Sequence, residues 1–437
     1  MSGRGVRTDG SAAERVRWPQ AVAVAAAAIA GVSTLFPACG GEERGGGSST
    51  SSSGASGTSG APTGTVGPTP PPVTLPTVTE IVDEADTPCT PMGGARSVVY
   101  TQAPSGTPVE QLSVVGARRL AQLADSTGFV LFDASGQAAM ASAAEPFPSR
   151  NVAASTGSDV LALGVNSQAV WALRYDLQGA PVGSPFHVGA GEAEGLVATG
   201  GGGLAFAAWS LGRGGVVAAS IGPTGAISSQ RVTFEDGVGM SARAALGEGD
   251  TVGLFWSAGS ETEGRTFFRR LRTSGPSPDN PRLIRIEGSG RRETRGVART
   301  ARGWVGLVDI GSVPHLLAMD DAGKPLGPIR RLRGPARSFG LAVSGDVVAV
   351  LAYRTEVHPN DADGGAPEVE PSEIEVRLFD PGGAPKPNGW LCIEKPATSV
   401  FVGGALLGEP DGFTAVYGGI VGATKLTRFD QLGAGVP

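Results

Sequence analysis

Histidine and cysteine are scarce in this sequence: each occurs three times in 437 residues. His187, His315 and His358 form no H-E-x-x-H pattern and no pair with metal-ligand spacing, so nothing indicates a zinc hydrolase or another metal site. The G-x-S-x-G pattern of serine hydrolases and the G-x-x-x-x-G-K-[ST] phosphate loop are absent as well. The sequence therefore predicts no catalytic residue, no metal and no cofactor.

Aromatic and charged residues are also few, at 6% and 17% of the chain, and the net charge is −6. Proteins that bind nucleic acid usually combine a basic surface with stacking aromatic rings, so no nucleic-acid partner is expected. Long helical patterns are scarce. Glycine and proline are abundant instead, with 69 and 33 residues, and both residue types favour turns. Short apolar runs between frequent turns predict an all-β fold.

The N-terminal region predicts export from the cytoplasm. Arginines at 4, 7, 15 and 17 precede an apolar run over 21–36, which indicates a signal peptide over 1–38, with an uncleaved anchor as the alternative. Residues 39–72 are rich in Gly, Ser, Thr and Pro and have too little apolar surface to offset the entropy of ordering them. We therefore expect a disordered linker over 39–72 and a folded domain over 73–437.

The stretch "LFPACGG" at 35–41 resembles a bacterial lipoprotein lipobox, in which a Cys directly after a small residue is lipidated. Ala38 and Cys39 fit that pattern, whereas Phe36 stands where Leu is usual and Pro37 is uncommon. The resemblance implies that Cys39 carries lipid and becomes the first residue of the mature protein, which anchors the chain to a membrane without spanning it. The expected location is the cell envelope, either lipid-anchored to the outer membrane or secreted to the periplasm or surface.

The two remaining cysteines, Cys89 and Cys392, lie far apart in the sequence. An exported protein folds in an oxidising compartment, where an even number of cysteines predicts a disulfide. Two unpaired buried thiols are the alternative. If the cysteines are bonded, their Cα atoms should lie about 4.4–6.8 Å apart. Such a bridge would join the two ends of the folded domain.

A turn of the form D-x-x-G, or a variant that lacks the Asp, recurs seven times at intervals of about 43–60 residues. "YDLQG" (175–179) and "FDPGG" (379–383) are complete copies, whereas "IGPTGAI" (221–227) and "LRTSGPS" (271–277) lack the Asp. Each turn follows a short apolar run that predicts a buried strand, such as "VVAVLAY" (347–353). A four-stranded unit at this period predicts a β-propeller of about seven blades, with two tandem β-sandwiches as the alternative. The pattern resembles the degenerate propellers of exported bacterial proteins.

Two segments of this propeller carry specific expectations. The strand-like residues 73–82 precede the first blade, and the chain ends soon after the seventh turn. We expect 73–82 to complete the last blade, since a propeller that closes its ring removes an open sheet edge. The longest interval between turns holds a polar insertion, 356–373, which we expect to be a loop.

Positive charge gathers in residues 265–337, which hold 16 Arg and Lys but 6 Asp and Glu. In a propeller this segment covers about two neighbouring blades, and a basic sector attracts anionic partners. The candidate binding residues are Arg291, Arg292, Arg330 and Arg331. The alternative is a solvated face with no partner.

The sequence favours a membrane-anchored, non-catalytic binding or scaffold lipoprotein of the bacterial cell envelope. We expect a monomer whose partners are the membrane, through the lipid anchor, and an anionic polysaccharide or envelope protein. The alternative is an envelope enzyme acting on carbohydrate, with carboxylates at the mouth of the propeller channel. Two inward-facing carboxylates about 5–10 Å apart would favour that enzyme.

Overall fold

The computed structural model describes residues 80–436, and all of them belong to the unit Val73–Pro437. Within that range it leaves out residues 86, 95–96, 101–108, 124–127, 134–146, 148, 193–194, 234–237, 239, 261–263, 276, 278, 280, 287, 334–335, 359–367, 395–400 and 420–423. The predicted signal peptide, Cys39, the linker and residues 73–79 lie outside the described residues. The described residues form 30 β-strands and no α-helix, and none of them forms a helix that could cross a membrane.

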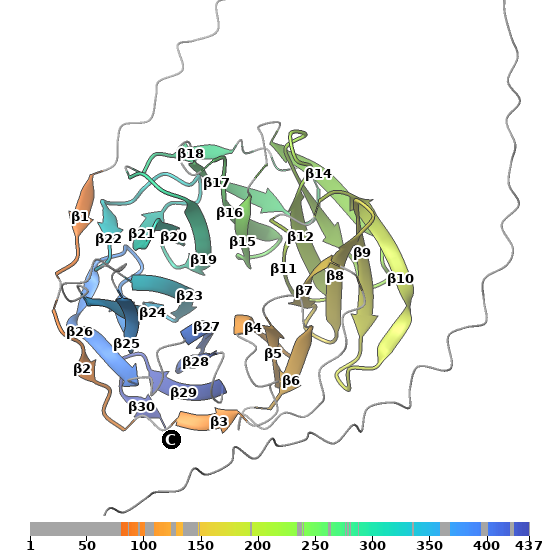
Figure 1. The fold of residues 1–437 in the computed structure, drawn as a ribbon. Helices are drawn as coiled ribbons and strands as arrows, with labels where there is room; N and C mark the ends of the chain where they lie inside the picture. The colour runs from red at the N-terminus through yellow and green to blue at the C-terminus, as the bar shows by residue number, and fades with distance from the viewer. Residues whose placement is uncertain are drawn as a thin grey trace, which may run out of the picture. The chain divides into compact units, whose positions relative to one another are not determined.

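The strands form seven sheets that stand around a central channel, with the innermost strand of each sheet facing the centre (Figure 1). The prediction of a seven-bladed propeller is therefore confirmed, and the tandem sandwich is excluded. Blades 1 to 4 consist of β4 (Val109–Val115), β5 (Arg118–Leu123) and β6 (Phe129–Phe132); β7 (Ser149–Ser155), β8 (Val160–Asn166), β9 (Ala169–Tyr175) and β10 (Pro181–Ala190); β11 (Val197–Gly201), β12 (Leu204–Ser210), β13 (Val216–Ile221) and β14 (Ile227–Thr233); and β15 (Ser241–Leu246), β16 (Thr251–Ala258), β17 (Arg265–Arg272) and β18 (Arg282–Ile284).

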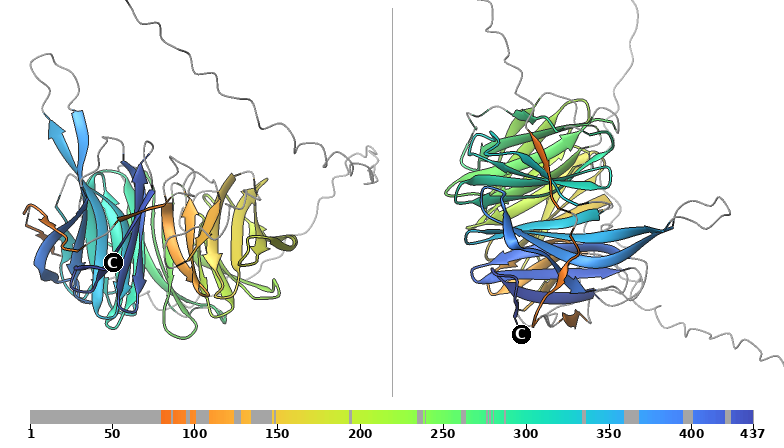
Figure 2. Two further views of the ribbon diagram at one scale, coloured as in Figure 1. Left: turned by 90° about the horizontal axis from the view of Figure 1, so that it is seen from below. Right: turned by 90° about the vertical axis from the view of Figure 1, so that its left-hand side faces the viewer.

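The later blades follow the same order from the channel outwards. Blades 5 to 7 consist of β19 (Arg292–Thr300), β20 (Gly303–Ile310), β21 (Val313–Met319) and β22 (Ile329–Arg331); β23 (Ala336–Ser344), β24 (Val347–His358), β25 (Glu368–Phe379) and β26 (Pro385–Glu394); and β27 (Phe401–Glu409), β28 (Gly412–Gly419), β29 (Thr424–Asp430), the short β30 (Gly435–Val436) and, from the other end of the domain, β3 (Ser97–Tyr100). Strands β24 and β25 continue as a two-stranded ribbon past their neighbours (Figure 2). The prediction that 356–373 is only a loop was therefore wrong, because the ribbon pairs as far as His358 and Glu368.

The recurring D-x-x-G turn has one hydrogen-bond pattern in four blades. The Asp Oδ1 atom accepts bonds from the backbone N–H groups two and four residues later, at 2.9 and 2.8 Å for Asp176. Asp320, Asp380 and Asp430 make the same pair of bonds. The Gly that follows each Asp by three residues has positive φ, for example 74° at Gly179, a conformation that Gly adopts without strain. The turn therefore recurs because it links the third and fourth strands of a blade.

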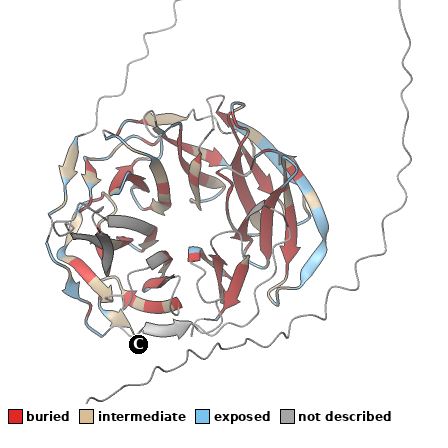
Figure 3. Ribbon diagram, in the orientation of Figure 1, coloured by how far each residue is buried: buried red, intermediate tan, exposed pale blue. Residues whose placement is uncertain are grey.

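The core lies between blades. Each of seven buried clusters draws its side chains from two neighbouring sheets, and together they run around the ring. Figure 3 shows many of the buried residues on the middle strands of the blades, and the burial is most continuous on the second strands β8, β12, β16 and β20. Trp209, Trp256, Trp304 and Trp390 are among the largest fully buried side chains. The last cluster joins blade 7 to blade 1, so the ring is closed by packing as well as by strand pairing.

Inner-strand glycines set the spacing around the channel in blades 5 to 7. A Cβ added to Gly296 would lie 2.5 Å from the Cβ of Leu341 in the next blade, and one added to Gly340 would lie 3.0 Å from the backbone nitrogen of Leu406. At Gly408 an added Cβ would overlap the carbonyl oxygen of Val343. Neighbouring inner strands therefore approach too closely for a side chain at these positions.

The strand that closes blade 7 is β3, which pairs antiparallel with β29 from Ser97↔Thr427 to Tyr100↔Thr424. The prediction that 73–82 closes this blade was wrong. The described part of that segment instead enters β1 (Ile81–Asp83), which adds parallel to β22 at the outer edge of blade 5. The chain then passes blade 6 before it reaches blade 7. An N-terminal segment therefore does close the ring, but it is Ser97–Tyr100 and not 73–82.

We call residues 80–94, described except for residue 86, the belt. Its second strand, β2 (Thr90–Pro91), pairs parallel with β26 at the outer edge of blade 6. Cys89 lies at disulfide distance from Cys392 of β26, with Cα atoms 5.2 Å apart, inside the range expected for a bond. Beside it, Arg333 donates to the backbone carbonyl of Thr87. The belt thus fixes the N-terminal segment to two blades before the chain reaches β3.

Candidate functional site

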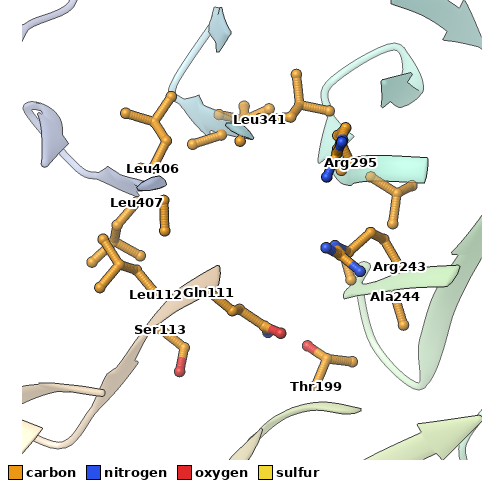
Figure 4. A pocket seen from close by; sticks show the side chains of 18 of the residues that line it. Gln111, Leu112, Ser113, Thr199, Arg243, Ala244, Arg295, Leu341, Leu406 and Leu407 are labelled. Atoms are coloured by element: carbon orange, nitrogen blue, oxygen red, sulfur yellow. The ribbon is translucent and has the colours of Figure 1, made fainter. Parts of the chain in front are cut away.

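The central channel holds a cavity of about 260 Å³. Six blades contribute to its wall, each through its innermost strand; blade 2 contributes none of the described lining residues. The lining comprises Glu110, Gln111, Leu112, Ser113, Thr199, Arg243, Ala244, Ala245, Leu246, Arg295, Gly296, Val297, Gly340, Leu341, Ala342, Val343, Ala405, Leu406, Leu407 and Gly408. Figure 4 shows these strands surrounding the cavity.

The inner strands carry bulges that direct side chains toward the channel. In five blades the pairing of the first and second strands shifts by one residue near the start of the inner strand. In blade 1 the shift makes Glu110 an extra residue between Val109 and Gln111. In blade 5 it makes Arg295 the extra residue in the same way. A bulge re-aims the side chain of the extra residue, which explains why charged groups reach the cavity from these two strands.

One wall of the cavity is polar. Figure 4 shows the Arg243 guanidinium pointing into the cavity beside Arg295, with Gln111 and Thr199 facing each other below them. Arg243 Nη1 donates to the carbonyl oxygen of Ala242 at 2.8 Å, which orients its guanidinium. Gln111 Nε2 donates to Ala198 O at 3.3 Å, so blade 1 contacts blade 3 across the blade between them.

Arg295 is held by carboxylates behind the wall. Its Nε donates to Asp309 Oδ2 at 2.9 Å, and its Nη2 contacts Glu293. Burial lowers the pKa of Arg295, but attraction by Asp309, Glu293 and Glu110 outweighs burial, so its pKa is raised above the usual value. Arg295 is therefore a fixed cation at the channel surface.

The opposite wall is apolar and comes from blades 6, 7 and 1. Leu112, Leu341, Leu406 and Leu407 lie on this side (Figure 4). A cavity with the Arg243 guanidinium on one wall, beside the ion-paired Arg295, and leucines on the other suits a ligand that has an anionic end and an apolar part. Among the described lining residues Glu110 is the single carboxylate, so this lining does not supply the carboxylate pair of a glycoside hydrolase.

The four arginines predicted from the charge layout all lie in or next to blade 5, but in different surroundings. Arg291 is 70% exposed and lies 3.3 Å from Glu293. Arg292 Nη2 donates to Ile286 O at 2.7 Å. Arg330 and Arg331 lie on β22 at the outer edge, far along the sheet from the inner strand β19.

Two of these arginines hold other parts of the chain. Arg330 Nε donates to the carbonyl oxygen of Gly383 in blade 6. Arg331 donates from Nε and Nη2 to the two carboxylate oxygens of Asp83, at 2.6 and 2.7 Å. Part of the basic segment therefore binds an acidic segment of the same chain, the belt. The predicted lipidation site, Cys39, lies outside the described residues.

No model of a known protein family matches the sequence, and no curated protein is detectably similar to it. A solved structure from a study of two prolyl endopeptidases aligns with a TM-score of 0.46 at 13% identity over 76% of this chain, which spans about half (49%) of that protein. A structure of the Dos1 propeller aligns with a TM-score of 0.44 at 11% identity over 77% of this chain and 95% of that one. At such identities the likeness concerns the fold alone. The propeller assignment rests on the strand pairing within this chain.

Proposed function

We propose that the protein is a non-catalytic binding lipoprotein of the bacterial cell envelope, and that the central channel is its ligand site. The observation that carries the proposal is the two-sided lining of the channel, with Arg243 and Arg295 on one wall and leucines on the other. The cavity is near the lower end of the roughly 300–1,000 Å³ typical of small-molecule sites. An end group of an anionic envelope polysaccharide, or an acidic side chain of an envelope protein, has the chemistry that this wall favours.

The same proposal includes membrane attachment through lipid on Cys39 and a tether over 39–72. Mass analysis of the mature protein tests this part, because a lipidated Cys39 adds the mass of the acyl chains to the N-terminal peptide. A Cys39→Ala protein should remain in the soluble envelope fraction. Equal membrane association of this variant would remove the lipid anchor from the proposal.

The binding activity can be tested with the full mature protein in detergent micelles on an array of envelope polysaccharides. We expect saturable binding to an anionic polymer that weakens as salt rises, since ions screen charge beyond about 8–10 Å. Arg243→Gln should weaken this binding, whereas Arg265→Gln, the same charge change on β17 of blade 4, should not.

The same assay separates binding from catalysis. After long incubation the bound polymer should keep its chain length. Shortened chains would instead support the alternative, a carbohydrate-active enzyme of the envelope. Binding that is equally strong in the Arg243→Gln protein would show that the channel is not the site.

A further inference from the structure

A second cavity, of about 290 Å³, lies where the ring closes between blades 7 and 1. We call it the seam cavity. One of its lining residues, Gly408, also lines the channel cavity. The β4–β5 hairpin, the β27–β28 hairpin and strand β29 form its wall. The lining comprises Val114, Gly116, Ala117, Arg118, Arg119, Gly408, Glu409, Pro410, Asp411 and Arg428.

Two arginines share one carboxylate in this wall. Glu409, whose side chain is 8% exposed, accepts a bond from Arg119 Nε at 2.7 Å and a longer contact from Arg428 Nη2 at 3.3 Å. The hydroxyl of Thr414 also donates to Glu409, at 3.1 Å. The carboxylate is therefore fully engaged, and the two guanidinium groups carry one more positive charge than the group between them.

The remaining charges of the seam cavity do not remove this excess. Arg118 adds a third guanidinium, which donates from Nη1 to the carbonyl oxygen of Leu177. Asp411 is exposed and adds one carboxylate, so the lining contains three cations against two anions. A partly enclosed cavity with surplus positive charge attracts an anion more strongly than open water does, because screening is weaker there.

Several donors on the two central arginines are not used by the described residues. Arg119 bonds to Glu409 through Nε and Nη2, which leaves Nη1; Arg428 uses Nη2 alone, which leaves Nε and Nη1. Guanidinium groups bind carboxylate and phosphate oxygens through pairs of parallel N–H donors. Arginines with unused donors therefore line the cavity from two strands, β5 and β29, that the ring closure brings together.

We propose that the seam cavity binds a small organic anion of about monosaccharide size, with its oxyanion on Arg119 and Arg428. The group recognised is a single carboxylate or phosphate monoester, and the rest of the ligand lies against Val114 and Pro410. The cavity is larger than an inorganic ion requires and slightly below the roughly 300 Å³ at which drug-sized sites begin. This site is separate from the proposed channel site and does not depend on it.

Calorimetric titration of the full mature protein in detergent tests the proposal with four probes: glucuronate, glucose 6-phosphate, inorganic phosphate and neutral glucose. We expect saturable binding of glucuronate, glucose 6-phosphate or both, and none of glucose. The stronger of the two identifies the oxyanion. Binding of inorganic phosphate as tight as that of both sugar anions would overturn the organic-ligand part of the proposal.

Variants connect the binding to the seam. Arg428→Gln should weaken it at least about tenfold, because a hydrogen bond to a charged group is lost, while Arg265→Gln, with the same charge change on an exposed arginine of blade 4, should leave it unchanged. Asp411→Asn removes an exposed carboxylate from the rim and should tighten binding about two- to fivefold. This variant leaves the buried Glu409 pairs intact, so it keeps the test valid even if Arg428→Gln unfolds the seam.

Two results would overturn the proposal: no saturable binding of any anionic probe, or the same affinities in the native, Arg428→Gln and Asp411→Asn proteins. The channel is tested independently, since Arg243→Gln should not alter binding at the seam. Failure at one site therefore leaves the other proposal standing.

Discussion

Two neighbouring acidic residues of the belt provide a matched test of how it holds the ring. Glu84 Oε1 accepts bonds from Arg377 Nε at 2.8 Å and Nη2 at 2.6 Å, and both side chains are 7% exposed. Asp83 pairs with Arg331 at a similar distance, but these side chains are 63% and 50% exposed. The two pairs therefore have similar geometry and differ in burial.

Glu84→Gln should destabilise the protein much more than Asp83→Asn. Removing one partner of a buried ion pair leaves the other charge uncompensated, which costs about 3–5 kcal/mol. Arg377 keeps bonds to the carbonyl oxygens of Lys386 and Gly389, so we expect the lower end of that range. An exposed pair contributes little because water and salt screen it, so Asp83→Asn should leave the stability nearly unchanged.

The expected effect can be measured by calorimetry or circular dichroism of the full-length protein. Unfolding entropy of about 2.1 cal/mol/K per residue, over about 360 residues, gives about 0.8 kcal/mol per degree. A loss of about 3 kcal/mol then lowers Tm by about 4 °C. Adding Arg377→Met to Glu84→Gln should cost little beyond the larger single effect, since the double variant has no unpaired charge.

Two results would contradict this expectation: a Glu84→Gln protein that melts within about 1 °C of the native protein, or an Asp83→Asn protein whose Tm falls as far as that of Glu84→Gln. The first result would mean that the buried pair does not hold the belt on blade 6. The second would mean that burial does not distinguish the two pairs.

Replacing both Cys89 and Cys392 by Ala removes a cross-link between residues 303 positions apart in the sequence. In the chain-entropy model this lowers the free energy of unfolding by about 5–6 kcal/mol. A Tm that neither this change nor dithiothreitol lowers would argue against a bond. Gly408→Ala overlaps a neighbouring carbonyl oxygen and should cost at least about 2 kcal/mol, whereas Gly327→Ala has open space and should be neutral; equal urea midpoints would contradict the close packing of inner strands. Burial raises the pKa of Glu375 from 4.5 to about 7, so between these values the native state keeps a proton that the unfolded chain has lost. Stability should fall as pH rises through this window, by up to about 3 kcal/mol relative to Glu375→Gln, and parallel pH profiles of the two proteins would refute this.

The blades could be predicted from the sequence because their turns are local. An Asp whose side chain bonds to backbone groups two and four residues later, followed by a Gly with positive φ, needs no distant partner. The strands before these turns are short apolar runs, and their period fixes the number of units. The pairing of Cys89 with Cys392 could be predicted because the lipobox resemblance assigns Cys39 to lipid, which leaves two of the three cysteines to join.

The belt could not be predicted in the same way. Strands β1 and β2 have 3 and 2 residues, which is too short to give an alternating pattern. Their partners, β22 and β26, lie hundreds of residues later in the sequence. The longer strand-like pattern at 73–82 predicts the closing strand there, whereas the ring closes with residues 97–100.

The channel residues were missed for a related reason. Side chains alternate along a strand, so a sequence can indicate which of them share a face. A bulge at Glu110 or Arg295 reverses that alternation, and it is visible only when the partner strand is known. The excess of positive charge in residues 265–337 was also only a partial guide to binding residues. A charge count cannot show that Arg331 and Arg333 contact the belt of the same chain.

The order of contacts along the belt determines where mechanical tension on the N-terminal side would be carried. A pull upstream of residue 80 acts first on β1, which is attached to blade 5 by three residue pairs and can peel away. The load then reaches Cys89 and, through a bond to Cys392, passes into β26 of blade 6. Strand β3 follows Cys89 in the chain and therefore does not carry this load. A pull applied upstream of residue 80 is therefore taken up by blade 6 before it reaches the closing strand of the ring.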